Sequence, residues 1–101
     1  MIVYEVTSHV DAEVADAYRA WLPPHVAEIL ALPGFLGATM AEGEGPNGLV
    51  SFWTSFHLVD HAALDAYVRD HAPRLRGDAQ ARFGGRFESH RRVGRVLPPL
   101  G

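Results

Sequence analysis

Hydrophobic and polar residues alternate in some stretches of this chain and recur every three or four positions in others. The first stretch, MIVYEVTSHV, alternates and is rich in β-branched and aromatic side chains, which is typical of a strand. The same kind of pattern predicts four strands in all, over residues 1–10, 35–42, 48–59 and 86–97. Asn47-Gly48 lies between the two middle strands and favours a tight hairpin turn.

Two helical regions are predicted between these strands. The first follows Asp11, a typical cap, and carries an apolar stripe made of Val14, Tyr18, Trp21, Val26, Ile29 and Leu30. Pro23 and Pro24 disfavour a helix just before them, so we expect two helical pieces in a line. The second region follows Asp60, and Pro73 is expected to restart it. The predicted order of elements is therefore βαββαβ.

An internal repeat supports this order. VDAEVADAY (10–18) and VDHAALDAY (59–67) align so that the two capping Asp residues pair and Tyr18 falls opposite Tyr67. Two such halves predict an α+β, ferredoxin-like fold, in which an antiparallel four-stranded sheet carries two kinked helices on one face. Chance matching in a chain rich in Asp and Ala is the alternative. We expect one domain over residues 1–97 and a short tail over 98–101.

The other face of such a sheet would have no helices to cover it. Trp53 and Leu49 share one parity along the third strand, and Val3 has the same orientation on the first. A face with these apolar side chains is expected to be covered by a second copy of the chain. The sequence therefore predicts a homodimer with Trp53, Leu49 and Val3 at its interface, although Trp53 could instead stack on a ligand.

Composition narrows the possible partners. The chain has 48% hydrophobic and 21% charged residues, a net charge of −3 and no cysteine. These values favour a folded soluble domain and give no electrostatic reason for a nucleic acid or an anionic membrane to be a partner. Disulfides, thiolate chemistry and lysine Schiff bases are excluded, and the six histidines lack metal-ligand spacing. We expect a cytoplasmic protein without a metal site.

Three segments carry a resemblance to a known superfamily. HVAEILALPGF (25–35), HAPRLRGDAQARFG (71–84) and the pair Arg91-Arg92 resemble a family of small uncharacterised bacterial proteins of the dimeric α/β-barrel superfamily. That superfamily includes antibiotic-biosynthesis monooxygenases, stress-responsive barrel proteins, polyketide cyclases and haem-degrading monooxygenases. The resemblance implies a dimeric barrel, a ligand cavity between the sheet and helices of each subunit, and enzymes that usually need no organic cofactor.

Candidate chemistry centres on a predicted cavity under the helices, lined by Tyr4, Tyr18, Phe52 and Phe56. His71 lies one turn after Tyr67, and this pair is similar to the acid-base pair of the polyketide-cyclase branch. The alternative is a core histidine that binds a carbonyl freed by Pro73. His25, on which the resemblance falls, is a further catalytic candidate, with a structural role at the double-proline kink as its alternative.

Arg76 and Arg91 are candidates for holding a carboxylate or an enolate, and they are the arginines on which the resemblance falls. The alternative is an ion-paired surface.

These residues predict a protein that binds a small, largely apolar molecule and acts on it without a cofactor, by His/Tyr acid-base chemistry of an isomerase, cyclase or monooxygenase type. A non-catalytic ligand-binding or stress-responsive protein is one alternative. Haem binding is another, although the only Asn, Asn47, lies in the hairpin, so the Asn-His-Trp set of the haem degraders is incomplete.

Overall fold

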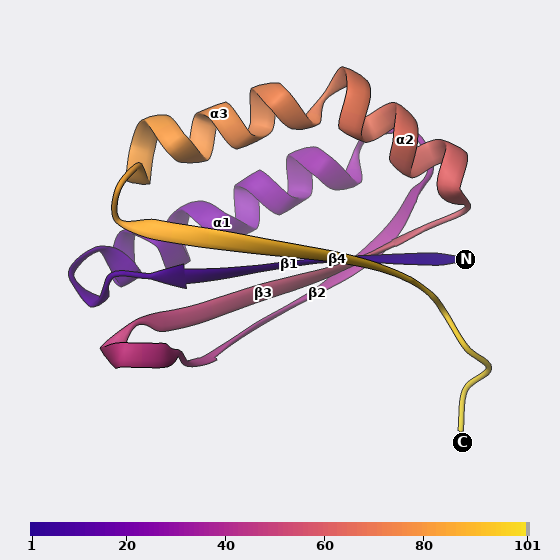
Figure 1. Cartoon of the computed structure of the whole chain (residues 1–101). Coiled ribbons are helices and arrows are strands. Elements are labelled where there is room, and N and C mark those ends of the chain that lie inside the picture. The colour runs from indigo at the N-terminus through magenta and orange to yellow at the C-terminus, as the bar shows by residue number, and fades with distance from the viewer. Residues whose placement is uncertain (101) are drawn as a thin grey trace.

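The computed structural model describes residues 1–100 and has two layers, a four-stranded sheet and the helices that cover one of its faces (Figure 1). The strands are β1 (Ile2–Val10), β2 (Phe35–Glu44), β3 (Val50–Leu58) and β4 (Phe87–Arg95). The helices are α1 (Ala15–Leu30), α2 (His61–Asp70) and α3 (Ala72–Phe83), with short 3₁₀ turns at Ala12–Val14 and Pro46–Gly48. Gly101, the last residue of the expected tail, lies outside the described residues.

The strands lie in the order β2-β3-β1-β4, and every neighbouring pair is antiparallel. Tyr4 of β1 stands opposite Phe56 of β3 and Val93 of β4, so these three positions share one face of the sheet. The predicted ferredoxin-like fold class is confirmed. The hairpin between β2 and β3 turns at Asn47 and Gly48, whose φ angles of 54° and 78° are those that a type I′ turn requires.

The two halves predicted from the repeat begin their helical regions in the same way. The Asp60 carboxylate accepts a hydrogen bond from the N–H of Ala63 at 2.9 Å, and the Asp11 carboxylate accepts one from Glu13 at 3.1 Å. These bonds satisfy amide groups that have no partner inside a helix. Both caps predicted from the sequence are therefore present.

The prolines were predicted to divide both helical regions, but only the second region is divided. Pro73 lies in the first turn of α3, where its missing N–H removes no helical hydrogen bond. Pro23 and Pro24 lie inside α1, which is unbroken, so the predicted division of that region into two pieces is wrong. Both prolines are exposed, and the carbonyls that lose a partner, four residues earlier, belong to exposed residues where water can replace it.

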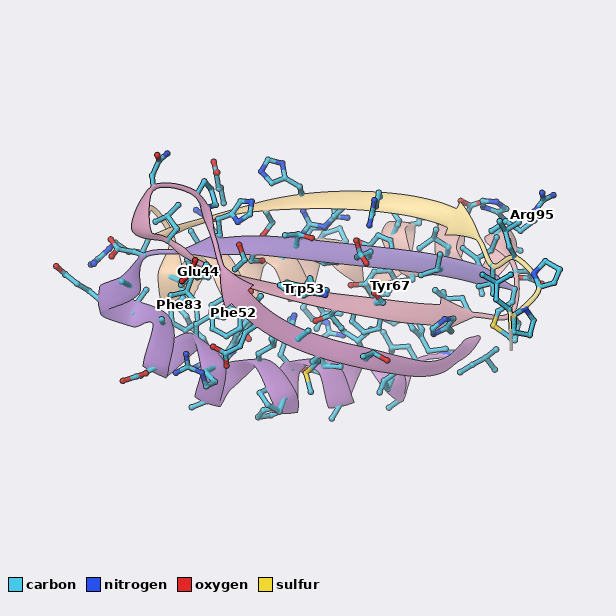
Figure 2. All side chains as sticks on the ribbon, turned by 90° about the horizontal axis from the view of Figure 1, so that it is seen from below. Glu44, Phe52, Trp53, Tyr67, Phe83 and Arg95 are labelled. Atoms are coloured by element: carbon cyan, nitrogen blue, oxygen red, sulfur yellow. The ribbon has the colours of Figure 1, made fainter. Side chains whose placement is uncertain are left out.

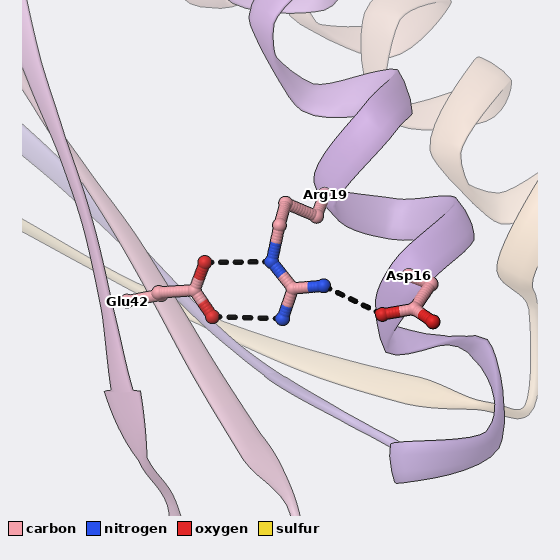
Figure 3. A network of polar contacts seen from close by, with 3 residues as sticks. All are labelled: Asp16, Arg19 and Glu42. Atoms are coloured by element: carbon pink, nitrogen blue, oxygen red, sulfur yellow. Dashed lines mark hydrogen bonds and ion pairs between the residues drawn. The ribbon is translucent and has the colours of Figure 1, made fainter.

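A guanidinium group connects α1 to the edge strand β2 (Figure 3). Arg19 donates two parallel hydrogen bonds to Glu42, at 2.7 and 2.8 Å, and a third to Asp16 at 2.7 Å. The hydrogen bonds from Arg19 lower the pKa of the Glu42 carboxyl. Exposed pairs of this kind add little stability, but the bidentate geometry fixes how α1 lies against the sheet.

The sheet buries one face and leaves the other open. On β3, Phe52 and Phe56 are buried beneath the helices, whereas Trp53 is 36% exposed on the open face, which Figure 2 shows from below. Val3 lies half-buried on the open face, and Leu49 lies just before β3, at the end of the hairpin turn. In the described part of the chain, no helix has the length and apolar character needed to span a membrane.

Candidate functional site

A cavity of about 330 Å³ lies between the sheet and the helices. Its floor consists of side chains that point from β1 and β3 toward the helices, namely Tyr4, Val6, Ser8, Phe52, Thr54 and Phe56. Its roof comes from all three helices, and β4 supplies one wall. The volume is near the lower end of the range of small-molecule sites, about 300–1,000 Å³.

The cavity opens on the side of β4. Its solvent-exposed lining residues all come from α3 and β4, and they are Arg76, Gln80, Glu88 and Arg91. Because β4 is an edge strand, no further strand within residues 1–100 closes that side. Arg76 and Arg91 therefore flank the entrance. The α1 helix lines the cavity with Trp21 and His25, and it packs toward β2, away from this entrance.

Two buried tyrosines and one arginine meet in the cavity. The rings of Tyr4 and Tyr67 are 6.0 Å apart in an edge-to-face arrangement, and Arg76 donates a hydrogen bond to the Tyr4 hydroxyl at 3.2 Å. The Tyr67 side chain is 5% exposed, yet within residues 1–100 its hydroxyl has no hydrogen-bond partner and is not fully enclosed by protein. Burial raises the pKa of Tyr67 to about 12, so this phenol stays a neutral donor.

A third tyrosine, Tyr18, belongs to a chain of hydroxyl groups. The Tyr18 hydroxyl donates to Ser8 Oγ at 3.0 Å, and Ser8 Oγ lies 2.8 Å from Ser89 Oγ across the β1-β4 pair. All three residues line the cavity. Burial raises the pKa of Tyr18, so this group is also neutral.

His25 is the one histidine among the described residues that lines the cavity. Its ring stacks on that of Trp21, with centroids 4.2 Å apart and planes 26° from parallel. Its Nδ1 atom is buried and has no hydrogen-bond partner within residues 1–100. Burial lowers the pKa of His25, against the smaller opposing effects of Asp78 and Glu28, so the imidazole is neutral near pH 7.

His71 does not line the cavity, so the prediction that it faces the cavity together with Tyr67 is wrong. The prediction rested on the position of His71 one helical turn after Tyr67. His71 is instead the single residue between α2 and α3, with φ −128° and ψ −36°, and the chain bends there. Tyr67 and Leu75 both line the cavity, whereas the half-buried His71 side chain does not.

The other residues selected from the sequence do come together. Tyr4, Tyr18, Phe52, Phe56, Tyr67, His25, Arg76 and Arg91 all line the cavity. Sequence reasoning missed Ser8, Thr54 and Ser89, which share strand parity with the buried aromatic residues and could have been found by that signal. Within residues 1–100, no three His, Asp or Glu side chains gather as a metal site would need.

Comparison by sequence finds a family but no characterised relative. A family model described as "Domain of unknown function (DUF4286)" matches residues 1–96. No curated protein matches the chain.

Comparison by structure finds many related folds at low sequence identity. An antibiotic biosynthesis monooxygenase has a TM-score of 0.68 at 18% identity, covering 97% of this chain and 100% of its own. SnoaB, a cofactor-independent oxygenase from Streptomyces nogalater, has a TM-score of 0.71 at 14% identity, covering 98% and 95%. A variant of MhuD with two manganese protoporphyrin IX molecules bound per active site has a TM-score of 0.73 at 16% identity, covering 100% and 99%. The resemblance seen in the sequence is therefore confirmed at the level of the fold.

Proposed function

The chain belongs to the DUF4286 family, a domain of unknown function, and from its cavity we propose that it binds a small, largely apolar molecule between its sheet and its helices. One observation carries the proposal. A cavity of about 330 Å³ has an aromatic floor, an open entrance and a few polar groups that converge on it, and this combination is typical of a ligand site.

We further propose that the protein acts on this molecule by proton transfer without a cofactor. Neutral His25 would remove a proton from an acidic carbon or a phenol and return it, and Tyr67 would donate a hydrogen bond to the neighbouring carbonyl oxygen. Return of the proton to a different atom of the enolate would isomerise the substrate. Attack of the enolate carbon on a second carbonyl carbon of the same molecule would cyclise it, with the proton going to that carbonyl oxygen. Removal of the same proton is also the first step in oxygenation of an activated phenol or enol.

Two further functions remain alternatives to this proposal. A non-catalytic binding protein would be favoured by a cavity with no converging His or Arg, whereas this cavity contains His25, Arg76 and Arg91. Haem binding is favoured by one observation, because His25 could supply an axial nitrogen from within the cavity.

Deuterium exchange tests the proton-transfer function directly. With 2-tetralone as an apolar, enolisable probe in D₂O, the wild-type protein should accelerate incorporation of deuterium next to the carbonyl, measured by NMR above the buffer rate. A His25→Phe variant keeps a ring against Trp21 but loses the base, so the acceleration should fall by about 100-fold. A His71→Ala variant should match the wild type.

The alternatives predict other results. Binding of 2-tetralone with no acceleration would indicate a binding protein. A shifted Soret band on titration with haem that is lost in His25→Phe would favour haem binding.

A further inference from the structure

The arginines of this chain divide into two groups. Within residues 1–100, six of the nine form ion pairs with a carboxylate, and these are Arg19, Arg69, Arg74, Arg82, Arg86 and Arg92. The remaining three, Arg76, Arg91 and Arg95, have no carboxylate partner in the same residues. Two of these three flank the cavity entrance.

The cavity entrance carries two positively charged hydrogen-bond donors, Arg76 and Arg91, but no carboxylate within residues 1–100 pairs with them. The one protein hydrogen bond of Arg76 goes to the neutral Tyr4 hydroxyl. Among residues 1–100, Glu88 is the only carboxylate residue in the lining, but it pairs in register with His9 on the open face of the sheet, and its carboxylate lies 3.9 Å from the His90 ring. Arg91 stands opposite Val6, on the face under the helices. The carboxylate of Glu88 therefore lies on the other side of the sheet from Arg91.

Electrostatic effects on the tyrosines agree with this placement. The charge of Arg91 acts on both Tyr18 and Tyr67, and in each it opposes the larger effect of burial on the pKa. The charge of Arg76 acts on Tyr67 as well. The charge of Arg74 has a smaller effect of the same sign, but this arginine is paired with Glu28. Arg76 and Arg91 are thus the two cavity-lining arginines whose charges act on Tyr67.

We propose that the natural ligand of this cavity is a small organic acid, whose carboxylate is bound by Arg76 and Arg91. Guanidinium groups match the planar geometry of a carboxylate. The apolar part of the acid lies over Phe52 and Phe56, and the cavity volume suits one or two rings. This inference rests on the proposed binding function and names the class of ligand.

The orientation of the acid follows from the same geometry. Its carboxylate stays at the entrance beside α3 and β4, so its ring extends toward α1, where His25 lines the cavity. The reacting carbon would therefore lie at the end of the molecule away from the carboxylate.

A matched pair of probes tests the inference. 2-Naphthoate and its neutral amide, 2-naphthamide, have nearly the same shape, so calorimetric titration of both isolates the contribution of the charge. Wild-type protein should bind the acid at least about 10-fold more tightly than the amide. Raising the salt concentration should weaken the binding of the acid and leave the binding of the amide unchanged. Arg76→Gln and Arg91→Gln should each remove most of this preference, and Arg76→Lys should retain part of it.

Arg95→Gln is the matched control, because Arg95 also has no carboxylate partner within residues 1–100 but does not line the cavity. Its preference for the acid should equal that of the wild type, and thermal melts of each variant would verify folding. Equal binding of acid and amide, or an equal loss in Arg95→Gln, would overturn the inference and leave the binding function standing. Failure of both probes to bind would count against the binding function itself.

Discussion

Burial keeps both His25 and Tyr67 neutral, because it disfavours the charged form of each side chain. It lowers the pKa of the imidazole and raises that of the phenol to about 12. At neutral pH the cavity therefore holds a neutral base, His25, and a neutral hydrogen-bond donor, Tyr67. The fixed charges lie at the entrance, on Arg76 and Arg91.

Replacement of His25 should change how stability depends on pH. The pKa of His25 is about 6.5 in the unfolded chain and lower in the folded protein, so between these values the unfolded chain binds more protons. The contribution of His25 is thus fully present above pH of about 6.5 and is lost as the pH falls toward the folded pKa. Urea melts should show that wild type loses more stability than His25→Phe between pH 7.5 and pH 5.

At pH 7.5 the two proteins should differ by no more than about 1 kcal/mol, because phenylalanine keeps the ring and removes a buried nitrogen without a partner. Parallel stability curves for the two proteins across the whole pH range would contradict this account of His25.

Alternation along the strands predicted most of the cavity residues correctly. Tyr4, Phe52 and Phe56 were identified because a strand presents every second side chain to the same face. His71 was misplaced because a helical stripe cannot be extended across a break, and the sequence does not show how far the chain rotates there. Arg76 and Arg91, selected from the sequence to hold an anion, flank the entrance because β4 is an edge strand.

The starts of the helical regions could be predicted from neighbouring residues, whereas the continuity of α1 could not. Both Asp caps were predictable, because capping requires only a side-chain oxygen and the next few N–H groups. The continuity of α1 through Pro23 and Pro24 was not predictable, because it depends on which side of the helix faces solvent after packing. Local rules describe the ends of these helices better than their interiors.

Loss of the α2 cap should measurably destabilise the protein. Asp60→Ala removes the acceptor of the Ala63 N–H and should lower the free energy of unfolding by about 1 kcal/mol, as measured by chemical denaturation. Asp65→Ala is the matched control, because Asp65 is an exposed acidic residue in the interior of the same helix. The control should not lose stability, since Ala is the better helix former. An equal loss in both variants would show that the cap does not stabilise α2.

At the scale of the whole molecule, one face of the sheet has no covering layer within residues 1–100. Trp53 lies near its centre among polar side chains, where Glu5 accepts hydrogen bonds from Ser55 at 2.9 Å and from Arg92 at 2.7 Å. The predicted homodimer would cover this face, and its prediction rests on the apolar side chains there. The domain boundary predicted at residue 97 likewise stays a prediction.

A negative charge at Trp53 on the open face should prevent formation of the predicted homodimer. We expect sedimentation velocity to show a dimer for the wild type at micromolar concentration and a monomer for Trp53→Asp, because a buried unpaired carboxylate is costly. Val68→Asp places the same charge at an exposed valine of α2, on the helical side, and should leave the dimer intact. A wild-type monomer at that concentration would refute the predicted dimer.

The position of β1 in the sheet has a consequence for how the protein is made. β1 precedes every other element in the chain, yet it lies in the sheet between β3 and β4. Ser8 meets Ser89 across a separation of 81 residues, and His9 meets Ser51 across 42. During synthesis one edge of β1 therefore stays unpaired until β3 has been made, and the other stays unpaired until β4, the last strand, has been made. In that interval the strand is exposed to aggregation and to chaperones.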